Sequence, residues 1–377
     1  MEVNQVASIV NELSQQYLGA DAVETVDLSN IVDVGSRVFD LDHLDKYVNS
    51  LIDRIGKVVF VNRAYRGKTP SLVMDAWEYG AVLEKITYDE YPEAQQNDSW
   101  ELQDGHSYDP NVFYKPKVSA KFFESRNTFD IPMSFAQRQI KSAFTSASQL
   151  MAFFGMIETA IQNSMTIKMD QLAEAALNNM IALTLQDNNG NRAVNLLSRY
   201  NTAFTKSLTA AQAITDPDFL RFASYTMKLF SERIQRLSKL FNVGSKERFT
   251  SSDRMHIVLL SEFAAGAEAY LYSTTFHDQF VHLTKAETVP YWQGSGTDYS
   301  FSSTSKISVI PTGSQSTVTG TGILGVMFDR DAVGIANLDR RTTSNWNGRA
   351  EFYNNWYKFD AGYFNDPNEN FVTFYVA

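Results

Sequence analysis

The chain has no cysteine among its 377 residues. Disulfide bonds, thiolate metal sites and cysteine nucleophiles are therefore excluded, and a reducing compartment fits this composition. The sequence also has no apolar stretch that approaches the roughly 18 residues of a membrane span. Residues 1–5 contain no basic segment that leads into an apolar run, as a secretory signal would. We therefore expect a soluble protein that is made in the cytosol.

Basic residues are in the minority. Lys and Arg total 33 against 43 Asp and Glu, which gives a formal net charge of -10. This balance argues against a protein whose main work is to bind nucleic-acid phosphates, although nucleic acid could be enclosed without being bound tightly. Because domains cluster around about 100–150 residues, the chain is long enough for two or three lobes.

Recognisable catalytic motifs are also absent. The sequence contains no G-x-S-x-G, no H-E-x-x-H and no P-loop. His256, His277 and His282 have neither the spacing nor the carboxylate partners of a metal ligand set. Residues 320–325 match the dinucleotide motif G-x-G-x-x-G, but the residues that follow are typical of a strand where this motif requires a helix. We therefore predict no enzyme, and no catalytic, cofactor-binding or metal-binding residues.

The hydrophobic pattern predicts several regular elements. Residues 148–185 contain no proline and have apolar residues at helical spacing, which indicates a spine helix of roughly 38 residues whose continuity at Gly155 stays open. Asp216 and Pro217 begin a second helix that would end at Gly244. Residues 294–322 are rich in Ser, Thr and Gly and indicate an exposed loop or hairpin. Strands are predicted at Phe129–Phe135, Met255–Leu260, Ile323–Ile335 and Asn370–Val376.

The segment from Arg63 to Phe123 differs in composition from the rest. It is polar and aromatic and has too few aliphatic residues for a core of its own, so we interpret it as a long excursion that packs on another surface. Its acidic run Asp89–Glu93 is either a docking patch for basic residues of a neighbouring copy or solvated loop charge. The candidate intersubunit contacts are Arg63, Arg66, Lys68, Trp77, Tyr79 and Trp100.

Four segments carry a resemblance to a known family. These segments are Tyr47–Val59, Phe122–Asn127, His256–Ser261 and Leu324–Asp331. In this order they resemble the major capsid protein of tailed bacteriophages with the Johnson, or HK-ninety-seven-like, fold, and most of all that of small podophages of the phi-twenty-nine type. The resemblance implies an α+β fold with an N-terminal arm, an extended loop, a peripheral domain that holds the spine helix, and an axial domain.

The same resemblance implies a division of the chain and a set of partners. The expected parts are the arm (1–38), the peripheral domain (39–61, 125–186 and 321–377), the extended loop (62–124) and the axial domain (187–320). Many copies would assemble in the host bacterial cytoplasm as pentamers and hexamers of an icosahedral virion shell that encloses double-stranded DNA. A separate scaffolding protein, a portal protein and possible decoration proteins would be its partners, with no cofactor.

Alternatives stay open beside this expectation. An encapsulin-like compartment would share the fold and hold enzyme cargo. A nucleotide-dependent oxidoreductase would use Gly320, Gly322 and Gly325 and would lose dinucleotide binding on Gly322→Val. Some members of the resembled family join a loop lysine to an asparagine of a neighbour by an isopeptide bond, although we expect non-covalent assembly. The residues that could take part are Lys68, Lys85, Asn337 and Asn354.

Overall fold

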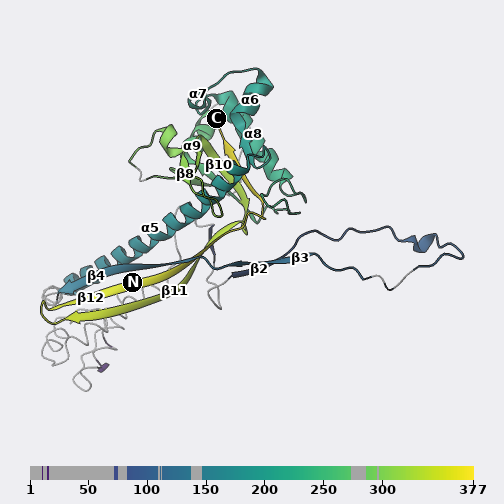
Figure 1. Ribbon diagram of the computed structural model, residues 1–377. Helices are drawn as coiled ribbons and strands as arrows, with labels where there is room; N and C mark the ends of the chain where they lie inside the picture. The colour runs from purple at the N-terminus through teal and green to yellow at the C-terminus, as the bar shows by residue number, and fades with distance from the viewer. Residues whose placement is uncertain are drawn as a thin grey trace. The chain divides into compact units, whose positions relative to one another are not determined.

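The computed structural model describes residues 11, 15–16, 72–74, 83–108, 111, 113–136, 147–272, 286–294 and 297–377 (Figure 1). These residues fall into two compact units. The described residues of the first unit lie mainly in Arg126–Leu172 and Ile335–Gly362. Those of the second unit lie in Glu78–Ser125, Ala173–Gly334 and Tyr363–Ala377.

A four-stranded sheet forms the first unit, in the order β1-β11-β12-β4. Its strands are β1 (Val73–Met74), β4 (Arg126–Ala136), β11 (Val333–Asn347) and β12 (Phe352–Asn365). β12 pairs antiparallel with β4, from Phe352 opposite Ala136 to Gly362 opposite Arg126. Side chains alternate along β12 between buried and half-buried positions, as expected for a strand with one covered face. The strand predicted at Phe129–Phe135 is confirmed as part of β4.

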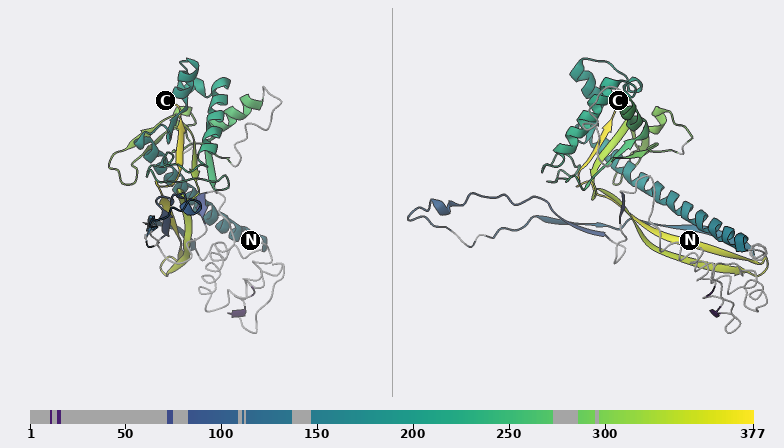
Figure 2. Two further views of the ribbon diagram at one scale, coloured as in Figure 1. Left: turned by 90° about the vertical axis from the view of Figure 1, so that its right-hand side faces the viewer. Right: turned by 180° about the vertical axis from the view of Figure 1, so that it is seen from behind.

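The spine helix is α5 (Ala147–Asp187), which has 41 residues and continues through Gly155 without interruption. The predicted helix is thus confirmed, and the question of a break at Gly155 is answered. Its part in the first unit lies along β4 and β12 in all three views (Figures 1 and 2). Buried side chains recur every three or four residues, which explains why this face packs. They include Ile157, Ile161, Met165, Met169 and Leu172.

A five-stranded sheet forms the centre of the second unit, in the order β5-β13-β10-β6-β7. Its strands are β5 (Ala193–Asn195), β6 (Met255–Leu260), β7 (Ala286–Val289), β10 (Ile323–Asp329) and β13 (Phe371–Tyr375). All seven residues of β10 are buried, as expected for a central strand with both faces covered. Residues 321–377 contribute strands to both sheets, since β10 and β13 pair with β6 and β5 while β12 belongs to the other sheet. Their place in a peripheral domain with the spine helix stays a prediction.

Short helices pack in the second unit. They are α6 (Leu196–Phe204), α7 (Ala210–Ala213), α8 (Pro217–Arg233), α9 (Ser261–Tyr272) and α10 (Phe301–Thr304). α8 begins as predicted, since the Asp216 side chain accepts a hydrogen bond from the Phe219 amide at 2.8 Å. The predicted end at Gly244 is wrong. After Arg233 the chain leaves the helix because the Ile234 carbonyl accepts from the Thr250 amide and Ser238 bridges to Arg248.

Two antiparallel hairpins complete the second unit. β8 (Ile307–Val309) pairs with β9 (Val318–Gly320), which confirms the hairpin alternative for residues 294–322. β2 (Leu83–Tyr88) pairs with β3 (Val118–Phe123) and carries the long loop between them, which includes the short 3-10 helix η3 (Asp98–Trp100).

Candidate assembly surface

The β2–β3 hairpin has two chemically different faces. Strand alternation places every second side chain on the same face. One face exposes large apolar side chains, and Ile86 and Phe122 are 67% and 58% exposed. The opposite face carries Lys85, Lys121 and the buried Phe123, whose ring lies 5.4 Å from that of Phe364. The hairpin therefore turns two lysines toward its own chain and exposes large apolar side chains, with Glu84 beside them on the exposed face.

Lys85 is the centre of a buried ionic cluster on the inward face. Its Nζ lies 2.9 Å from Asp366 Oδ2 and 2.8 Å from Glu369 Oε1, and the three side chains are only 15%, 3% and 8% exposed. Lys121 Nζ contacts the other oxygen of Asp366 at 3.0 Å. Two strands of the hairpin are thereby tied to the residues just before β13. Since the charges are paired and hydrogen-bonded, the cost of burying them is offset.

Arg248 extends the cluster on the other side of Glu369. Its Nε lies 3.1 Å from Glu369 Oε1, while Nη1 donates to the Tyr88 carbonyl at 2.7 Å and Nη2 to Thr87 Oγ1 at 3.0 Å. One guanidinium thus holds both a carboxylate of the chain end and the last residues of β2. The direction in which the hairpin leaves the unit is therefore set by charged contacts.

The acidic run Asp89–Glu93 lies directly after β2. Asp89 pairs with Lys246 at 2.9 Å, and Glu90 pairs with Lys117 at 2.5 Å and with Lys239 at 3.4 Å. The Lys246 ammonium lowers the pKa of the Asp89 carboxyl. These first two residues pair with lysines of the same chain, and the Glu90–Lys117 pair is largely exposed, in keeping with the interpretation as solvated loop charge. Docking of a neighbouring copy stays a prediction.

Burial acts differently on the two carboxyls of the ionic cluster. Burial alone would raise the pKa of Asp366, but the Lys85 and Lys121 ammonium groups together lower it below its ordinary value of 3.8. For Glu369, burial raises the pKa above 4.5, and Lys85 and Arg248 offset this only in part. The two carboxyls should therefore have opposite effects on the pH dependence of stability.

We expect Glu369→Gln to reveal this difference in urea denaturation between pH 3 and pH 8. A raised pKa in the folded state means that folded protein binds the proton more tightly than unfolded protein. The free energy of unfolding of the wild type, relative to the variant, should therefore fall as the pH rises above 4.5. Asp366→Asn is the matched control with the opposite sign, because the contribution of Asp366 should be lost as the pH falls below 3.8. If the difference in unfolding free energy between wild type and variant changed with pH in the same direction for both variants, this assignment would be contradicted.

Beyond the hairpin, the loop exposes aromatic side chains. Trp100 is 95% exposed and Phe113 84%, and Leu102, Tyr108 and Tyr114 are also exposed. Figure 1 shows the loop running from β2 through η3 and back to β3. The candidate contact Trp100 thus lies on open surface. The other five candidates, Arg63, Arg66, Lys68, Trp77 and Tyr79, lie outside the described residues.

The residues considered for an isopeptide bond are placed as follows. Lys85 Nζ is held by two carboxylates of its own chain. Asn354 Oδ1 accepts a hydrogen bond from Ser134 Oγ at 2.6 Å across the β12–β4 pair. Asn337 lies in β11, and Lys68 lies outside the described residues. Lys121, Arg248, Asp366 and Glu369 were not identified from the sequence, although the alternation of β2 could have placed Lys85 opposite the apolar face.

The glycines of the G-x-G-x-x-G match serve the packing of strands. Gly322 has φ +71°, and a Cβ there would overlap the carbonyl oxygen of Val376. The Val376 amide donates to the Gly322 carbonyl at 2.8 Å. The following residues form a strand, β10, as predicted, and not the helix that a dinucleotide site requires. The predicted single strand Ile323–Ile335 is wrong in its extent, because a turn at residues 330–332 separates β10 from β11 of the other sheet. The space that the motif would offer to a pyrophosphate is thus occupied by the backbone of Val376, the residue after β13.

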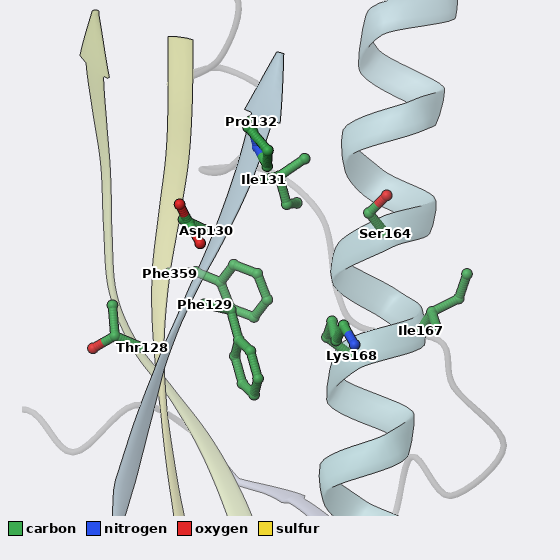
Figure 3. A pocket seen from close by; sticks show the side chains of 9 residues that line it. All are labelled: Thr128, Phe129, Asp130, Ile131, Pro132, Ser164, Ile167, Lys168 and Phe359. Atoms are coloured by element: carbon green, nitrogen blue, oxygen red, sulfur yellow. The ribbon is translucent and has the colours of Figure 1, made fainter.

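A cleft of about 490 Å³ lies in the first unit between β4, β12 and α5 (Figure 3). The rings of Phe129 and Phe359 form its floor, 5.2 Å apart. Ser164 and Lys168 of α5 line the opposite side, and Lys168 Nζ donates to Gln171 Oε1 at 3.1 Å. The lining is mainly apolar and includes one acidic side chain, Asp130.

Within the described ranges, no group of three or more His, Asp or Glu side chains is placed to hold a metal ion. None of the helices in those ranges combines the length and apolarity needed to cross a membrane.

Comparisons with solved structures identify the fold. A chain in the capsid structure of Staphylococcus phage Andhra has a TM-score of 0.52 at 9% identity, covering 84% of this chain and 86% of that chain. A chain in a structure of the head fiber and inner core protein gp22 of native bacteriophage P68 has a TM-score of 0.54 at 9% identity, with the same coverage. The expected α+β, HK-ninety-seven-like fold class is confirmed.

Comparisons of sequence identify the family. The major capsid protein of Bacillus phage GA-1 is 26% identical over 146 residues, which are 37% of this chain. The match covers 28% of that relative's length. The family of Phi29-like phage major capsid proteins matches residues 6–375, nearly the whole sequence. The chain therefore belongs to the Phi29-like phage major capsid protein family.

Proposed function

We propose that this chain is the shell-forming subunit of an icosahedral bacteriophage head that encloses double-stranded DNA. The observation that supports this most is the family match over residues 6–375. It favours a viral shell over an encapsulin-like compartment or an oxidoreductase. A net charge of -10 suits such a wall, since a shell that bound packaged DNA tightly would resist its release.

The extended loop and its hairpin are the parts that we propose join copies. The loop exposes Trp100 and Phe113, and the hairpin exposes Ile86 and Phe122 on one face. Exposed large apolar and aromatic side chains of this kind are typical of a protein interface. The ionic cluster around Lys85 would hold that face outward, toward a second copy. Each contact between two copies is weak, but a closed shell contains many such contacts, and their free energies together stabilise the assembly.

The proposal includes the arrangement and partners implied by the family resemblance. Pentamers and hexamers of the chain would assemble in the host cytoplasm with a scaffolding protein and a portal protein, and decoration proteins are possible further partners. In this arrangement the extended loop (62–124) would lie on the adjacent subunit, and the axial domain (187–320) would meet its copies around the five-fold and six-fold axes. The arm (1–38) and the peripheral parts would complete the subunit. Charge and aromatic contacts of the loop, including Trp100, would lie between copies.

Electron microscopy tests the proposed function. The purified chain is expressed alone and with a candidate scaffold, and both samples are imaged in negative stain. Closed shells or ring-shaped capsomers are the expected result. A stable monomer or dimer in both samples would contradict the proposal.

Trp100→Ala should separate assembly from folding. Because Trp100 is 95% exposed, its removal should change the free energy of unfolding of the subunit by no more than about 0.5 kcal/mol. At an interface, a buried Trp contributes about 2 kcal/mol or more per contact, so the yield of shells should fall at least tenfold. Yield is measured by sedimentation at equal protein concentration. The matched control is Ile310→Ala, which removes an exposed apolar side chain outside the loop. Normal shells from Trp100→Ala would exclude this contact.

A further inference from the structure

Two arginines of the second unit lie over the same aromatic ring. Arg199 is in α6, and Arg233 is the last residue of α8. Their guanidinium carbons lie 5.4 Å and 5.9 Å from the centre of the Phe230 ring. We propose that this arginine pair binds a carboxylate side chain of a second copy of the chain. The inference rests on the proposed shell-forming function and assigns to it a contact outside the extended loop.

The arginines of the second unit differ in whether a carboxylate pairs with them. Four other arginines of the second unit have carboxylate partners, namely Arg192 with Asp187, Arg221 with Asp218, Arg248 with Glu369, and Arg254 with Asp329 and Asp331. Among the described residues, neither Arg199 nor Arg233 has such a partner. Burial lowers the pKa of Arg199, and the positive charge of Arg233 lowers it further. Two like charges therefore lie within 6 Å of the centre of one ring in a chain with an excess of acidic residues.

The pair is held on a rigid base. Phe230 is buried, and its ring makes edge contacts with Phe241 at 6.0 Å and Phe374 of β13 at 5.5 Å. Arg199 Nη2 donates to the Gly190 carbonyl at 2.6 Å, which fixes the orientation of its guanidinium. Arg233 is exposed at the C-terminal end of α8, where the helix carbonyls favour a positive charge. The remaining N–H groups of a fixed fork match the two oxygens of a carboxylate.

A carboxylate of a second copy suits this site better than a nucleic acid. Affinity for nucleic acid comes from several cations that neutralise successive phosphates. Near this pair the other α8 charges are already balanced, because Arg221 pairs with Asp218 and Lys228 with Glu232. Two guanidinium groups on one ring can instead accept a single acidic side chain. A chain with 43 acidic and 33 basic residues offers many such side chains on every neighbouring copy.

Isotope-mixed shells give a direct test. Arg233→Lys is prepared in natural-abundance and nitrogen-15 forms, mixed and assembled, and treated with a carbodiimide that joins an amine to a contacting carboxylate. Mass spectrometry then identifies the partner of position 233. The expected result is a cross-linked peptide pair with mixed isotopes, which arises only between copies. Pairs from one isotope alone, or no pair at this position, would overturn the proposal. Arg221→Lys is the control, since its partner is Asp218 of the same helix.

Charge reversal gives a second measurement on the unlabelled chain. Arg233→Glu should lower the yield of shells at least tenfold at equal concentration, whereas Arg221→Glu on the same helix should assemble normally. Thermal unfolding of each subunit shows whether folding is preserved, and the cross-linking test decides if Arg233→Glu fails to fold. Normal assembly of Arg233→Glu would overturn the proposal. Failure of the unaltered chain to form shells would instead contradict the proposed function itself, and this contact with it.

Discussion

Replacing Lys85 with Met should lower the free energy of unfolding of the subunit by about 3–5 kcal/mol. The substitution leaves the carboxylates of Asp366 and Glu369 buried and removes a cation that lies within 3 Å of both. Breaking a buried ion pair costs this much because the remaining charge is not solvated. Lys121 and Arg248 stay in place, so each carboxylate keeps one partner, and we expect the loss to lie at the lower end of this range. Urea denaturation at pH 7 measures the change.

The control for this prediction is Lys117→Met in the same hairpin segment. Lys117 also pairs with a carboxylate, that of Glu90, but its side chain is 70% exposed. Solvent screens such a pair, so its loss should have little effect on stability. If both variants lost the same small amount, the ionic cluster would not hold the hairpin. The Lys85→Met variant should also assemble poorly, because the apolar face of the hairpin would no longer be held outward.

Gly322→Ala should destabilise the second unit by about 3 kcal/mol or more. An alanine at φ +71° is strained by about 1–2 kcal/mol. Its Cβ would also overlap the Val376 carbonyl oxygen, which is backbone and cannot move without shifting the last strand. The pairing of β10 with β13, and the hydrogen bond from the Val376 amide to the Gly322 carbonyl, would both be disturbed. Thermal or urea unfolding of the soluble subunit measures the loss.

Gly313→Ala is a matched control for this substitution. Gly313 has φ +85°, but no atom lies within 4 Å of the position of its Cβ. It should therefore show the backbone strain alone, and the difference between the variants isolates the overlap with Val376. A dinucleotide-binding protein would behave differently, since Gly322→Ala or Gly322→Val would then remove binding and leave stability nearly unchanged. Equal stability losses for Gly322→Ala and Gly313→Ala would contradict the role assigned to Gly322.

Local patterns were sufficient for much of the fold. The spine helix was predicted at 148–185 because a proline-free stretch with a 3.6-residue apolar period is a strong signal, and α5 extends it by one residue at the start and two at the end. Residues after the glycine motif were predicted as a strand from their β-branched and aromatic composition, and β10 confirms this. The start of α8 followed from its Asp216 cap and Pro217.

Long-range pairings could not be predicted in the same way. Lys85 meets Asp366 and Glu369 across 281 and 284 residues of sequence, a distance at which residue spacing carries no information. The apolar pattern continued past Arg233, but α8 ends there because residues 238 and 248 bridge and the helix is not extended. The division of residues 321–377 between two sheets likewise depends on which strands pair. Which strands pair, and which charged residues meet, depends on how the whole chain folds and cannot be deduced from one segment.

The most direct test of the account is a residue-resolution electron microscopy reconstruction of the assembled shell. We expect the apolar face of the β2–β3 hairpin, with Ile86 and Phe122, and the loop residue Trp100 to be covered by a second copy, while Lys85 keeps its contacts with Asp366 and Glu369. A closed shell in which this face and Trp100 remain in solvent would contradict the assignment of the extended loop as the contact between copies.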